Sequence, residues 1–456
     1  MALSHSQLLA DRWQGRFQGR LLSREDEFYS AACRIWNGMI DRRPALIARC
    51  ESSADVRAAI QLAQAEHLPL SVRGGGHGVA GNALCHDGLT IDLSRMQRVD
   101  VDAERREAIA QPGVLWGGFD AATGAHGLAT TGGQVSHTGI AGLTLGGGLG
   151  YLMGKYGAVC DNLLAVELVT ADGELLTVSE DENAELFWAV RGAGANFGIV
   201  TSFRYRLHAL PQVLAGLLLH PRERAPELFA FYREFLRGTP DELDTTFAYM
   251  NAPDGTPLVA VVAVYAGDPD EGARLLAPLR AFGPPIADLI QPMPYAAAQG
   301  MIDAGVPIGN RYYWKSSFGK VLSDDLGAVL KSSADAMASP LSMILLFEIK
   351  GAIQRVAKDA MAFDHRDENF EMSIIAQWTD PAADEANIRW TRESWHAAQP
   401  FVSQAVYANH MTADESEERV RAAYGSKYER LAGLKAKYDP TNLFRMNHNI
   451  PPLTAG

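Results

Sequence analysis

Long hydrophobic runs, cysteine and positive charge are all scarce in this sequence of 456 residues. No apolar run, 213–219 included, approaches the roughly 20 residues that cross a bilayer, and the N-terminus lacks the pattern of a signal peptide. The formal net charge of −13 is opposite in sign to what phosphate-backbone binding needs. We therefore expect a cytoplasmic protein that binds neither membrane nor nucleic acid.

The sequence has only four cysteines, Cys33, Cys50, Cys85 and Cys160, and no two of them have the CxxC spacing of a zinc site. A chain of this length with so few cysteines is not a disulfide scaffold. The expectation is four free thiols in a reducing compartment, and no metal centre.

Glycine is distributed unevenly. It concentrates between Gly74 and Gly198 and thins after Leu210-Pro211, where an alternation of strands and helices begins. The chain is too long for one compact core, so two domains or one large composite domain are expected. The glycine-rich first half is predicted to form loops around a ligand.

Hydrophobic periodicity predicts an α+β fold, with an antiparallel sheet backed by helices in the second half. Asp172-Gly173 between two apolar runs predicts a hairpin. The expected strands are 68–72, 89–93, 165–170, 175–179, 199–207, 247–250, 258–265, 343–350 and 370–378. The expected helices are 53–66, 182–190, 226–237, 269–282, 324–338 and 424–437.

The sequence contains three glycine clusters, 76–81, 142–150 and 192–198, and their presence needs a physical explanation. The first matches GxGxxG, but no helix follows it, so the dinucleotide-binding fingerprint fails. The second is not a Walker A loop, because Leu149 and Tyr156 stand where glycine and Ser/Thr are required. Tight turns are the alternative. Three clusters in one stretch favour a large, flat, phosphorylated cofactor.

His77 lies inside the first cluster. A single histidine is most often structural or solvent-facing. Here glycines on both sides remove competing side chains, which would let the imidazole press against the edge of a ligand.

The loop Arg73–Gly78 resembles the flavin-attachment loop of the berberine-bridge-enzyme-like FAD-linked oxidases, members of the vanillyl-alcohol-oxidase (PCMH-type) flavoprotein superfamily. The pattern of Ile35-Trp36, Arg43-Pro44 and residues 46–50 is similar to that of the bacterial hydroxy-D-nicotine oxidases in this family. Further matching stretches, in the family's order and across nearly the whole chain, are 142–150, 155–157, 161–162, 185–198, 438–445 and 449–451.

The resemblance implies a PCMH-type FAD-binding domain over 1–209 with its core at 40–209, an antiparallel substrate domain over 210–405, and a C-terminal segment, 406–456, that returns to the FAD domain. It also implies a set of FAD-binding residues. These are Val72, Arg73, Gly74, Gly75, Gly76, His77, Gly78, Gly81, Asn82, Gly133, Thr138, Gly139, Gly142, Gly146, Gly147, Gly150, Gly198, Ile199, Val200, Asn447 and Asn449.

Many members of the family attach FAD twice, through a histidine and a cysteine. The cysteine position corresponds to Val135 here, and Cys160 lies too far along the chain to replace it. The resemblance therefore implies FAD attached covalently through His77 only.

Flavin oxidation needs a substrate C–H bond over the ring and often a base for an O–H or N–H proton. Strand alternation in 343–350 puts Leu346, Glu348 and Lys350 on one face, and the resemblance places that face over the flavin. Glu348 is the leading candidate for the base. A solvated Glu–Lys pair is nearly as good an interpretation. Lys350 stands where the hydroxy-D-nicotine oxidases have a second acid, which leaves amine specificity open.

By the same resemblance, Tyr407 and Asn409 lie beside substrate and flavin, and His137 and Thr138 border the place where dioxygen meets reduced flavin. The alternatives are a core position for Tyr407 and a turn residue for Thr138. Four aromatic residues in predicted strands could line a pocket: Tyr249, Tyr312, Tyr313 and Trp378. Aromatic residues in strands are, however, more often part of the core.

The favoured function is an oxidase that takes hydride from CH–OH or CH–NH of a small molecule and passes electrons to dioxygen, releasing hydrogen peroxide. Thr138 and the missing cysteine motivate an alternative, a flavin monooxygenase or oxidative cyclase of secondary metabolism. A nucleotide-binding sensor without redox activity is a weaker third hypothesis. We expect a monomer or a homodimer.

Overall fold

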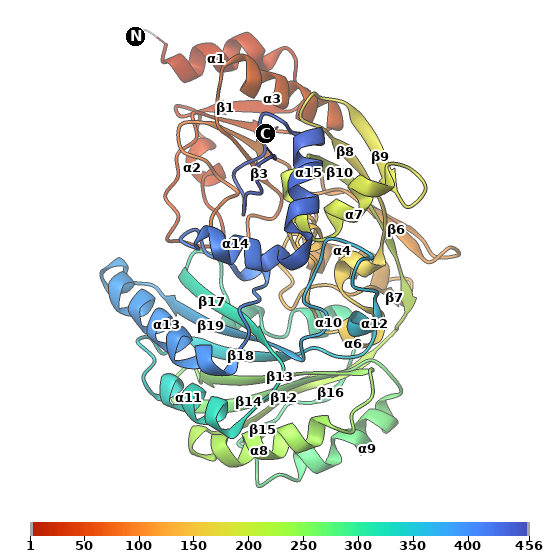
Figure 1. The fold of residues 1–456 in the computed structure, drawn as a ribbon, viewed down its shortest axis with the longest axis vertical. Coiled ribbons are helices and arrows are strands. Elements are labelled where there is room, and N and C mark those ends of the chain that lie inside the picture. Colours follow the sequence, from red (N-terminus) through yellow and green to blue (C-terminus); the bar gives the residue numbers. More distant parts are fainter. Residues whose placement is uncertain (1–2, 454–456) are drawn as a thin grey trace.

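The computed structural model describes residues 3–453, which build two sheet-containing halves stacked one on the other (Figure 1). The first half begins with a mixed four-stranded sheet. β1 runs antiparallel to β2, while β2 and β3 run parallel to β4. The order is β1 (Arg20–Ser23), β2 (Leu46–Arg49), β4 (Leu89–Asp92) and β3 (Leu70–Arg73). Near this sheet lie α1 (His5–Gln14), α2 (Tyr29–Ala32) and α3 (Ser53–Ala65).

Helix α3 forms as the pattern predicts. Ser52 caps its N-terminus, and Val56, Ile60 and Ala63 are buried in a cluster with β2, β3 and β4. The buried face of α3 thus holds the sheet from which the first glycine loop leaves.

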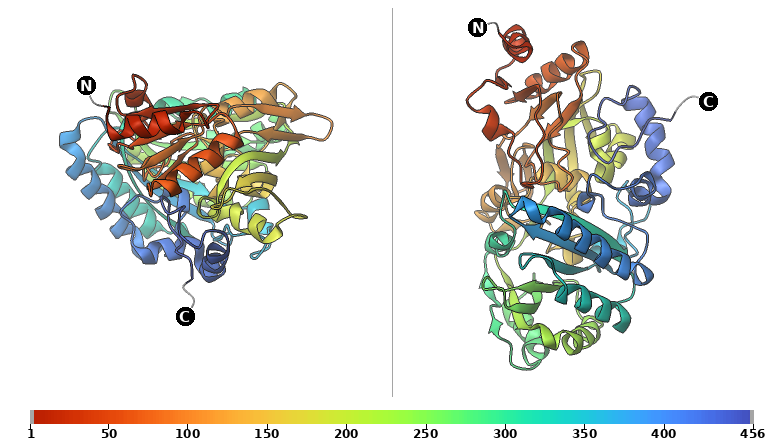
Figure 2. Two further views of the ribbon diagram at one scale, coloured as in Figure 1. Left: turned by 90° about the horizontal axis from the view of Figure 1, so that it is seen from above. Right: turned by 90° about the vertical axis from the view of Figure 1, so that its left-hand side faces the viewer.

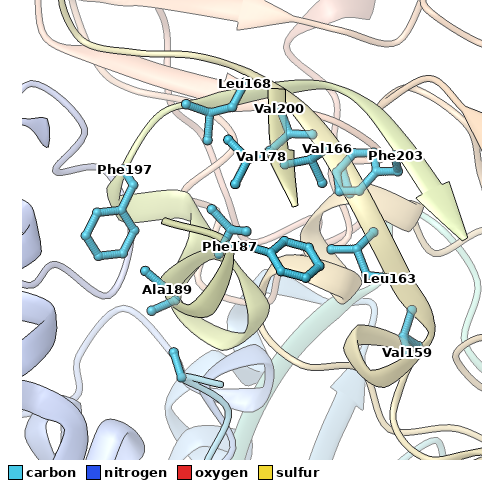
Figure 3. Packing of buried hydrophobic residues seen from close by; sticks show 14 of the residues in the cluster. Val159, Leu163, Val166, Leu168, Val178, Phe187, Ala189, Phe197, Val200 and Phe203 are labelled. Carbon is cyan, nitrogen blue, oxygen red and sulfur yellow. The ribbon is translucent and has the colours of Figure 1, made fainter. Parts of the chain in front are cut away.

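An antiparallel five-stranded sheet completes the first half, and α7 packs its apolar face on it (Figure 3). Phe187 and Ala189 of α7 meet Val178 and Phe203 in that core. The predicted hairpin at Asp172-Gly173 joins β8 and β9. The strand order is β5 (Val99–Asp102), β6 (Glu107–Ala110), β10 (Ile199–Arg206), β8 (Leu163–Val169) and β9 (Leu175–Ser179). The remaining elements of this half are α4 (Trp116–Gly124), β7 (Leu128–Ala129), α5 (Ile140–Leu145), α6 (Met153–Tyr156), α7 (Ala184–Ala193) and β11 (His208–Ala209).

The second half is one antiparallel sheet with helices on its outer face (Figures 1 and 2). Its order is β15 (Ala287–Asp288), β12 (Val213–Pro221), β14 (Pro257–Tyr265), β13 (Leu243–Asn251), β18 (Met343–Glu348), β19 (Phe370–Trp378) and β17 (Arg311–Gly319), with β16 (Gln291–Met293) also on β12. The helices are α8 (Ala225–Leu236), α9 (Pro269–Arg280), α11 (Asp324–Asp335) and α13 (Asp384–Ala398), with α10 (Tyr295–Gln299) and α12 (Ala352–Arg355) at the junction of the halves. The sheet's other face is directed at the first half.

The C-terminal helices α14 (Glu417–Tyr424) and α15 (Tyr428–Tyr438) lie against the first half, beside α7 (Figures 1 and 2). Leu431 and Ala432 are buried in the same core as Phe187. Lys435 is fully buried, and its Nζ donates to the backbone oxygen of Asn196 and to Asp439. A charge that is buried and paired in this way ties the end of the chain to the third glycine cluster.

The predicted α+β class, with antiparallel sheets, is confirmed. The apolar run 213–219 is the centre of β12, and the chain makes an additional helix, α13, that the pattern analysis did not predict. Among residues 3–453, no helix has the length and hydrophobicity to cross a membrane.

A small cavity of about 110 Å³ lies between α4 and α10, and Asp120 is one of the residues that line it. Neither carboxyl oxygen has a hydrogen-bond partner within the described chain, and burial raises the pKa of Asp120 well above its ordinary value. The folded protein therefore keeps a proton that the unfolded chain loses above pH of about 4. The free energy of unfolding therefore falls as the pH rises above that value, because the buried carboxyl group must stay protonated.

Asp120→Asn removes this titration and is expected to stabilise the protein more at pH 8 than at pH 5. The expected gain in Tm at pH 8 is about 2 °C or more, measured by thermal denaturation. An equal shift at both pH values would contradict the buried, protonated carboxyl group.

Candidate active site

A cavity of about 330 Å³ lies between the two halves. Its walls come from all three glycine clusters, from strands β17, β18 and β19, and from the C-terminal segment. The predicted site residues that line it are Val72, Gly74, Gly75, Gly76, His77, Gly78, Asn82, Gly133, Thr138, Gly139, Gly142, Gly146, Tyr407, Asn409 and Asn447.

The first glycine loop lines this cavity and carries unpaired backbone donors. Within residues 3–453, the N–H groups of Gly75, Gly76, His77 and Gly78 donate to no protein acceptor. Gly76 has a φ of +70°, which curls the loop so that successive N–H groups can converge. Convergent backbone donors form an anion-binding nest, the arrangement that phosphate groups need.

His77 is held rigidly at the cavity wall. Its ring stacks on Trp36, with centroids 4.4 Å apart and planes 15° apart, and Trp36 stacks in turn on Tyr312. His77 Nε2 lies 3.1 Å from His137 Nδ1. Burial, and then the neighbouring His137, lower the pKa of His77 to about 3. The imidazole is therefore neutral at physiological pH and keeps the lone pair that a nucleophile requires.

The lining of the cavity, taken over residues 3–453, contains no Asp, Glu, Lys or Arg. A phosphorylated ligand would therefore be held by backbone N–H groups and neutral side chains. Buried polar atoms of two lining residues also lack partners within the described chain: Oδ1 of Asn447 and Nε1 of Trp314. Unpaired buried groups of this kind usually find a partner in a ligand or in water. A glycine cradle, an anion nest and unpaired donors and acceptors fit FAD.

Several predicted cofactor residues lie outside the cavity wall and have structural reasons for their identity. A Cβ at Gly147 would lie 2.4 Å from Phe363, and a Cβ at Gly150 would lie 2.0 Å from the backbone oxygen of Gly132. Close packing within the protein therefore explains part of the second glycine cluster. The predictions of direct cofactor contact that the lining does not support are those for Arg73, Gly81, Gly147, Gly150, Gly198, Ile199, Val200 and Asn449.

Tyr407 and Asn409 connect the C-terminal segment to the second glycine cluster. The hydroxyl oxygen of Tyr407 accepts from the backbone N–H of Gly148 and of Leu149, and from Asn409 Nδ2. Asn409 Nδ2 also donates to the backbone oxygen of Leu143. A phenol oxygen that accepts three N–H bonds positions these segments and is a poor candidate for a base.

Thr138 and Val135 line the cavity, whereas Cys160 does not. Cys160 is fully buried against Met361, and burial raises the pKa of its thiol above the usual range. His137 lies behind His77, and its Nε2 is buried without a partner in the described chain. Of the four free cysteines, none lines the cavity.

The prediction that Glu348 faces the cavity as the catalytic base is wrong. Met343, Leu345 and Phe347 line the cavity, so Glu348 points to the opposite face of β18. There its carboxylate accepts from Thr245 at 2.9 Å and pairs with Lys350 Nζ at 3.0 Å. The sequence could not show which alternate residues of β18 face the cavity, because both faces of this strand are covered and both are mostly apolar.

A different acid–base pair borders the cavity through its histidine. His410 lines it, and His410 Nδ1 lies 2.9 Å from Oε1 of Glu371, which is fully buried. Ser373 Oγ donates to both oxygens of the same carboxylate. Because a carboxylate can only accept, Nδ1 carries the proton, and Nε2 has no hydrogen-bond partner within residues 3–453. Sequence inspection missed this pair, because 39 positions separate its members. The one available signal was the polar Glu371 and Ser373 at alternate positions in an apolar strand.

Two family models match the chain, one described as "FAD binding domain" over residues 44–179 and one described as "Berberine and berberine like" over residues 406–451. An FAD-linked oxidoreductase of Dictyostelium discoideum is 30% identical over 433 residues, which is 94% of this chain and 93% of the relative. The (R)-6-hydroxynicotine oxidase of Paenarthrobacter nicotinovorans is 30% identical over 451 residues, which is 95% and 97%.

The crystal structure of 6-hydroxy-D-nicotine oxidase from Arthrobacter nicotinovorans is similar in fold. The TM-score is 0.88 at 30% identity, and the match covers 96% of this chain and 98% of that one. Together, the fold and the cavity define an FAD-linked oxidoreductase. The chain belongs to the berberine-bridge-enzyme-like family of these enzymes, which confirms the family and the enzyme class expected from its motifs.

Proposed function

We propose that this enzyme is an oxidase that carries FAD on His77 alone, oxidises CH–OH or CH–NH of a small molecule, and uses dioxygen as acceptor with release of hydrogen peroxide. The observation that carries the proposal is a neutral imidazole at the wall of a glycine-lined cavity that also contains an anion nest.

Attachment is proposed at His77 Nδ1, because Nε2 is engaged by His137 at 3.1 Å. Stacking on Trp36 keeps the ring in one orientation, which favours one site of bond formation. Val135 contributes only an apolar side chain to the wall, which supports a single bond. The nest of Gly75, Gly76, His77 and Gly78 would hold the phosphates, with Asn447 as a further contact.

FAD, when bound, would supply the two-electron chemistry: it would accept hydride and pass electrons to dioxygen. The protein's part is to orient the substrate, exclude water and move a proton. The segments 1–209 and 406–456 would hold the cofactor, and 210–405 would cover the substrate. The small polar Thr138 at the cavity wall leaves space for dioxygen.

The test uses purified holoprotein. Yellow colour that stays with the protein after acid precipitation, and one peroxide released per substrate oxidised, would support the proposal. The second candidate, a monooxygenase or oxidative cyclase, is favoured by Thr138 and by Val135 in place of the attachment cysteine. It would be supported instead by ¹⁸O from labelled dioxygen in the product. A colourless protein would rule out both.

A further inference from the structure

We infer that the substrate is an uncharged, mostly apolar alcohol with a flat ring, and that His410 Nε2 removes its hydroxyl proton with Glu371 holding the imidazole. This inference rests on the proposed oxidase function and narrows it to CH–OH. Two independent features carry it: the His410–Glu371 pair and the composition of the cavity floor.

The orientation of His410 is fixed on several sides. Its Nδ1 is held by Glu371 at 2.9 Å and lies 3.1 Å from Ser373 Oγ. The edge of Trp314 meets its ring at a centroid distance of 4.7 Å and 86°, and Tyr407 does so at 4.8 Å and 76°. Within residues 3–453, Nε2 has no hydrogen-bond partner. An imidazole whose Nδ1 is held by a carboxylate and whose Nε2 is free at a cavity wall has the geometry of a general base.

Glu371 is a positioning residue. It is fully buried behind His410 and Ser373, does not line the cavity, and touches the substrate only through the imidazole. Its charge stabilises the imidazolium that forms when His410 takes a proton. The titratable groups that face His410 are Glu371 from β19, His77 from the first glycine loop and Tyr407 from its own segment.

The floor of the cavity beneath His410 is apolar and aromatic. It consists of side chains on the inner face of three neighbouring strands: Trp314 from β17, Met343, Leu345 and Phe347 from β18, and Ile375 from β19. Ile302 and Val306 extend this surface. A wall of this kind favours flat apolar molecules, because their burial removes apolar surface from water.

The same wall disfavours the other substrate classes of an oxidase. A sugar would bury several hydroxyl groups against Leu345, Phe347 and Ile375, and each group without a partner costs free energy. A carboxylate or an alkylammonium ion would find no opposite charge, since no Asp, Glu, Lys or Arg of residues 3–453 lines the cavity. An alcohol whose one hydroxyl group is directed at His410 Nε2 and whose apolar ring lies on the floor satisfies both the imidazole and the apolar surface.

The reaction balances for an alcohol. The O–H bond breaks and its proton goes to His410 Nε2, the C–H bond breaks with its electron pair and its hydrogen passing to FAD, and the C–O bond becomes C=O. Two electrons and two protons then convert dioxygen to hydrogen peroxide, one of the protons returning from His410.

The first experiment compares substrate classes on the holoprotein by anaerobic flavin reduction. 4-Methoxybenzyl alcohol and 1-(2-naphthyl)ethanol represent the inferred class, and cellobiose, mandelate and benzylamine represent polyols, anions and amines. The better aryl alcohol should exceed each of the others by about 100-fold or more in the second-order rate constant of flavin reduction, the discrimination expected when polar groups are buried unpaired. A higher second-order rate constant for cellobiose, mandelate or benzylamine would overturn the inference.

The second experiment separates proton transfer from binding. His410→Gln should lower the rate of flavin reduction by about 10²- to 10⁴-fold, the usual contribution of a general base. The affinity of the same variant for 2-naphthol, a neutral aromatic probe followed by tryptophan fluorescence, should change no more than about tenfold, the worth of one hydrogen bond. A rate close to that of the unmodified enzyme would show that His410 is not the base.

A matched pair of variants tests the positioning role: Glu371→Gln is the test and Glu348→Gln is its control, because both are buried carboxylates on adjacent strands. Glu371→Gln should slow flavin reduction and move the acid limb of its pH profile to lower pH, because the imidazolium loses its negative partner. Glu348→Gln, on the other face of the sheet, should leave the limb in place. Similar profiles for the two variants, at equal Tm, would contradict the positioning role.

Failure of this inference is distinguishable from failure of the proposed function. If 2-naphthol binds and the aryl alcohols reduce the flavin without forming peroxide in air, the oxidase function fails and the substrate class stands. If another class reduces the flavin and yields peroxide, the oxidase function stands and the inference fails. Absence of 2-naphthol binding also overturns the inference.

Discussion

Replacing His77 with alanine is expected to remove all covalent flavin from the protein. After acid precipitation, the yellow colour of His77→Ala should be entirely in the supernatant, whereas that of the unmodified protein should stay in the pellet. The reason is that His77 lies in the first glycine loop at the cavity wall and that its lowered pKa leaves the imidazole lone pair free. Absorbance of the two fractions, together with the mass of the intact chain, measures the result.

Cys160→Ala is the matched control for this experiment. Its thiol is buried and its high pKa keeps it protonated, so the variant should retain the full flavin mass. Flavin that remains on the chain in His77→Ala would contradict single attachment. His77→Ala is also expected to oxidise substrate more slowly, because the proposed covalent bond would withdraw electron density from the flavin.

The second large effect is expected at Gly75, where two glycine loops meet backbone to backbone. A Cβ at Gly75 would lie 2.5 Å from Cα and 2.6 Å from the backbone nitrogen of Gly139. Neither atom can rotate away as the end of a side chain could. Gly75→Ala should therefore separate the loops, cost about 1–3 kcal/mol or more of unfolding free energy, and distort the anion nest. Thermal denaturation and the flavin content of the purified protein measure both consequences.

Gly118→Ala is a matched control for Gly75→Ala. Gly118 is in α4, and a Cβ there would meet nothing within 4 Å. Alanine is the better helix former by up to about 1 kcal/mol, so this variant should be neutral or slightly more stable and should keep its flavin. A loss of flavin in Gly118→Ala equal to that in Gly75→Ala would refute the close-approach explanation.

The glycine clusters illustrate how far a sequence pattern can be taken. Their concentration between Gly74 and Gly198 indicated a ligand cavity, and all three clusters do reach one. The pattern could not separate glycines that face the cavity, such as Gly76, from glycines that make room for other parts of the protein, such as Gly147 beside Phe363. That distinction depends on contacts between segments far apart in the chain.

The face of the sheet that lines the cavity could not be predicted from the sequence. Two acids, Glu348 and Glu371, lie on neighbouring strands, and the one singled out from the sequence faces the helices. In a strand covered on both sides, hydrophobicity does not alternate along the sequence. A shift of one residue in the expected alternation then moves every side chain to the opposite face of the sheet. His410 gained a functional interpretation only because the C-terminal segment crosses β19 beside Glu371.

Sequence alone determined the features that are local or that belong to an ordered set of motifs. These are the α+β class, the amphipathic helix α3, the hairpin at Asp172-Gly173, the family, and His77 as the candidate attachment residue. These follow from periodicity, turn chemistry and motif order, which are properties of contiguous residues. Tertiary structure alone decided which face of β18 lines the cavity, which glycines reach it, and that Glu371 and His410 meet there. The physical reason is that burial and hydrogen-bond pairing are set by neighbours in space, and the strands and loops that supply those neighbours are distant in sequence.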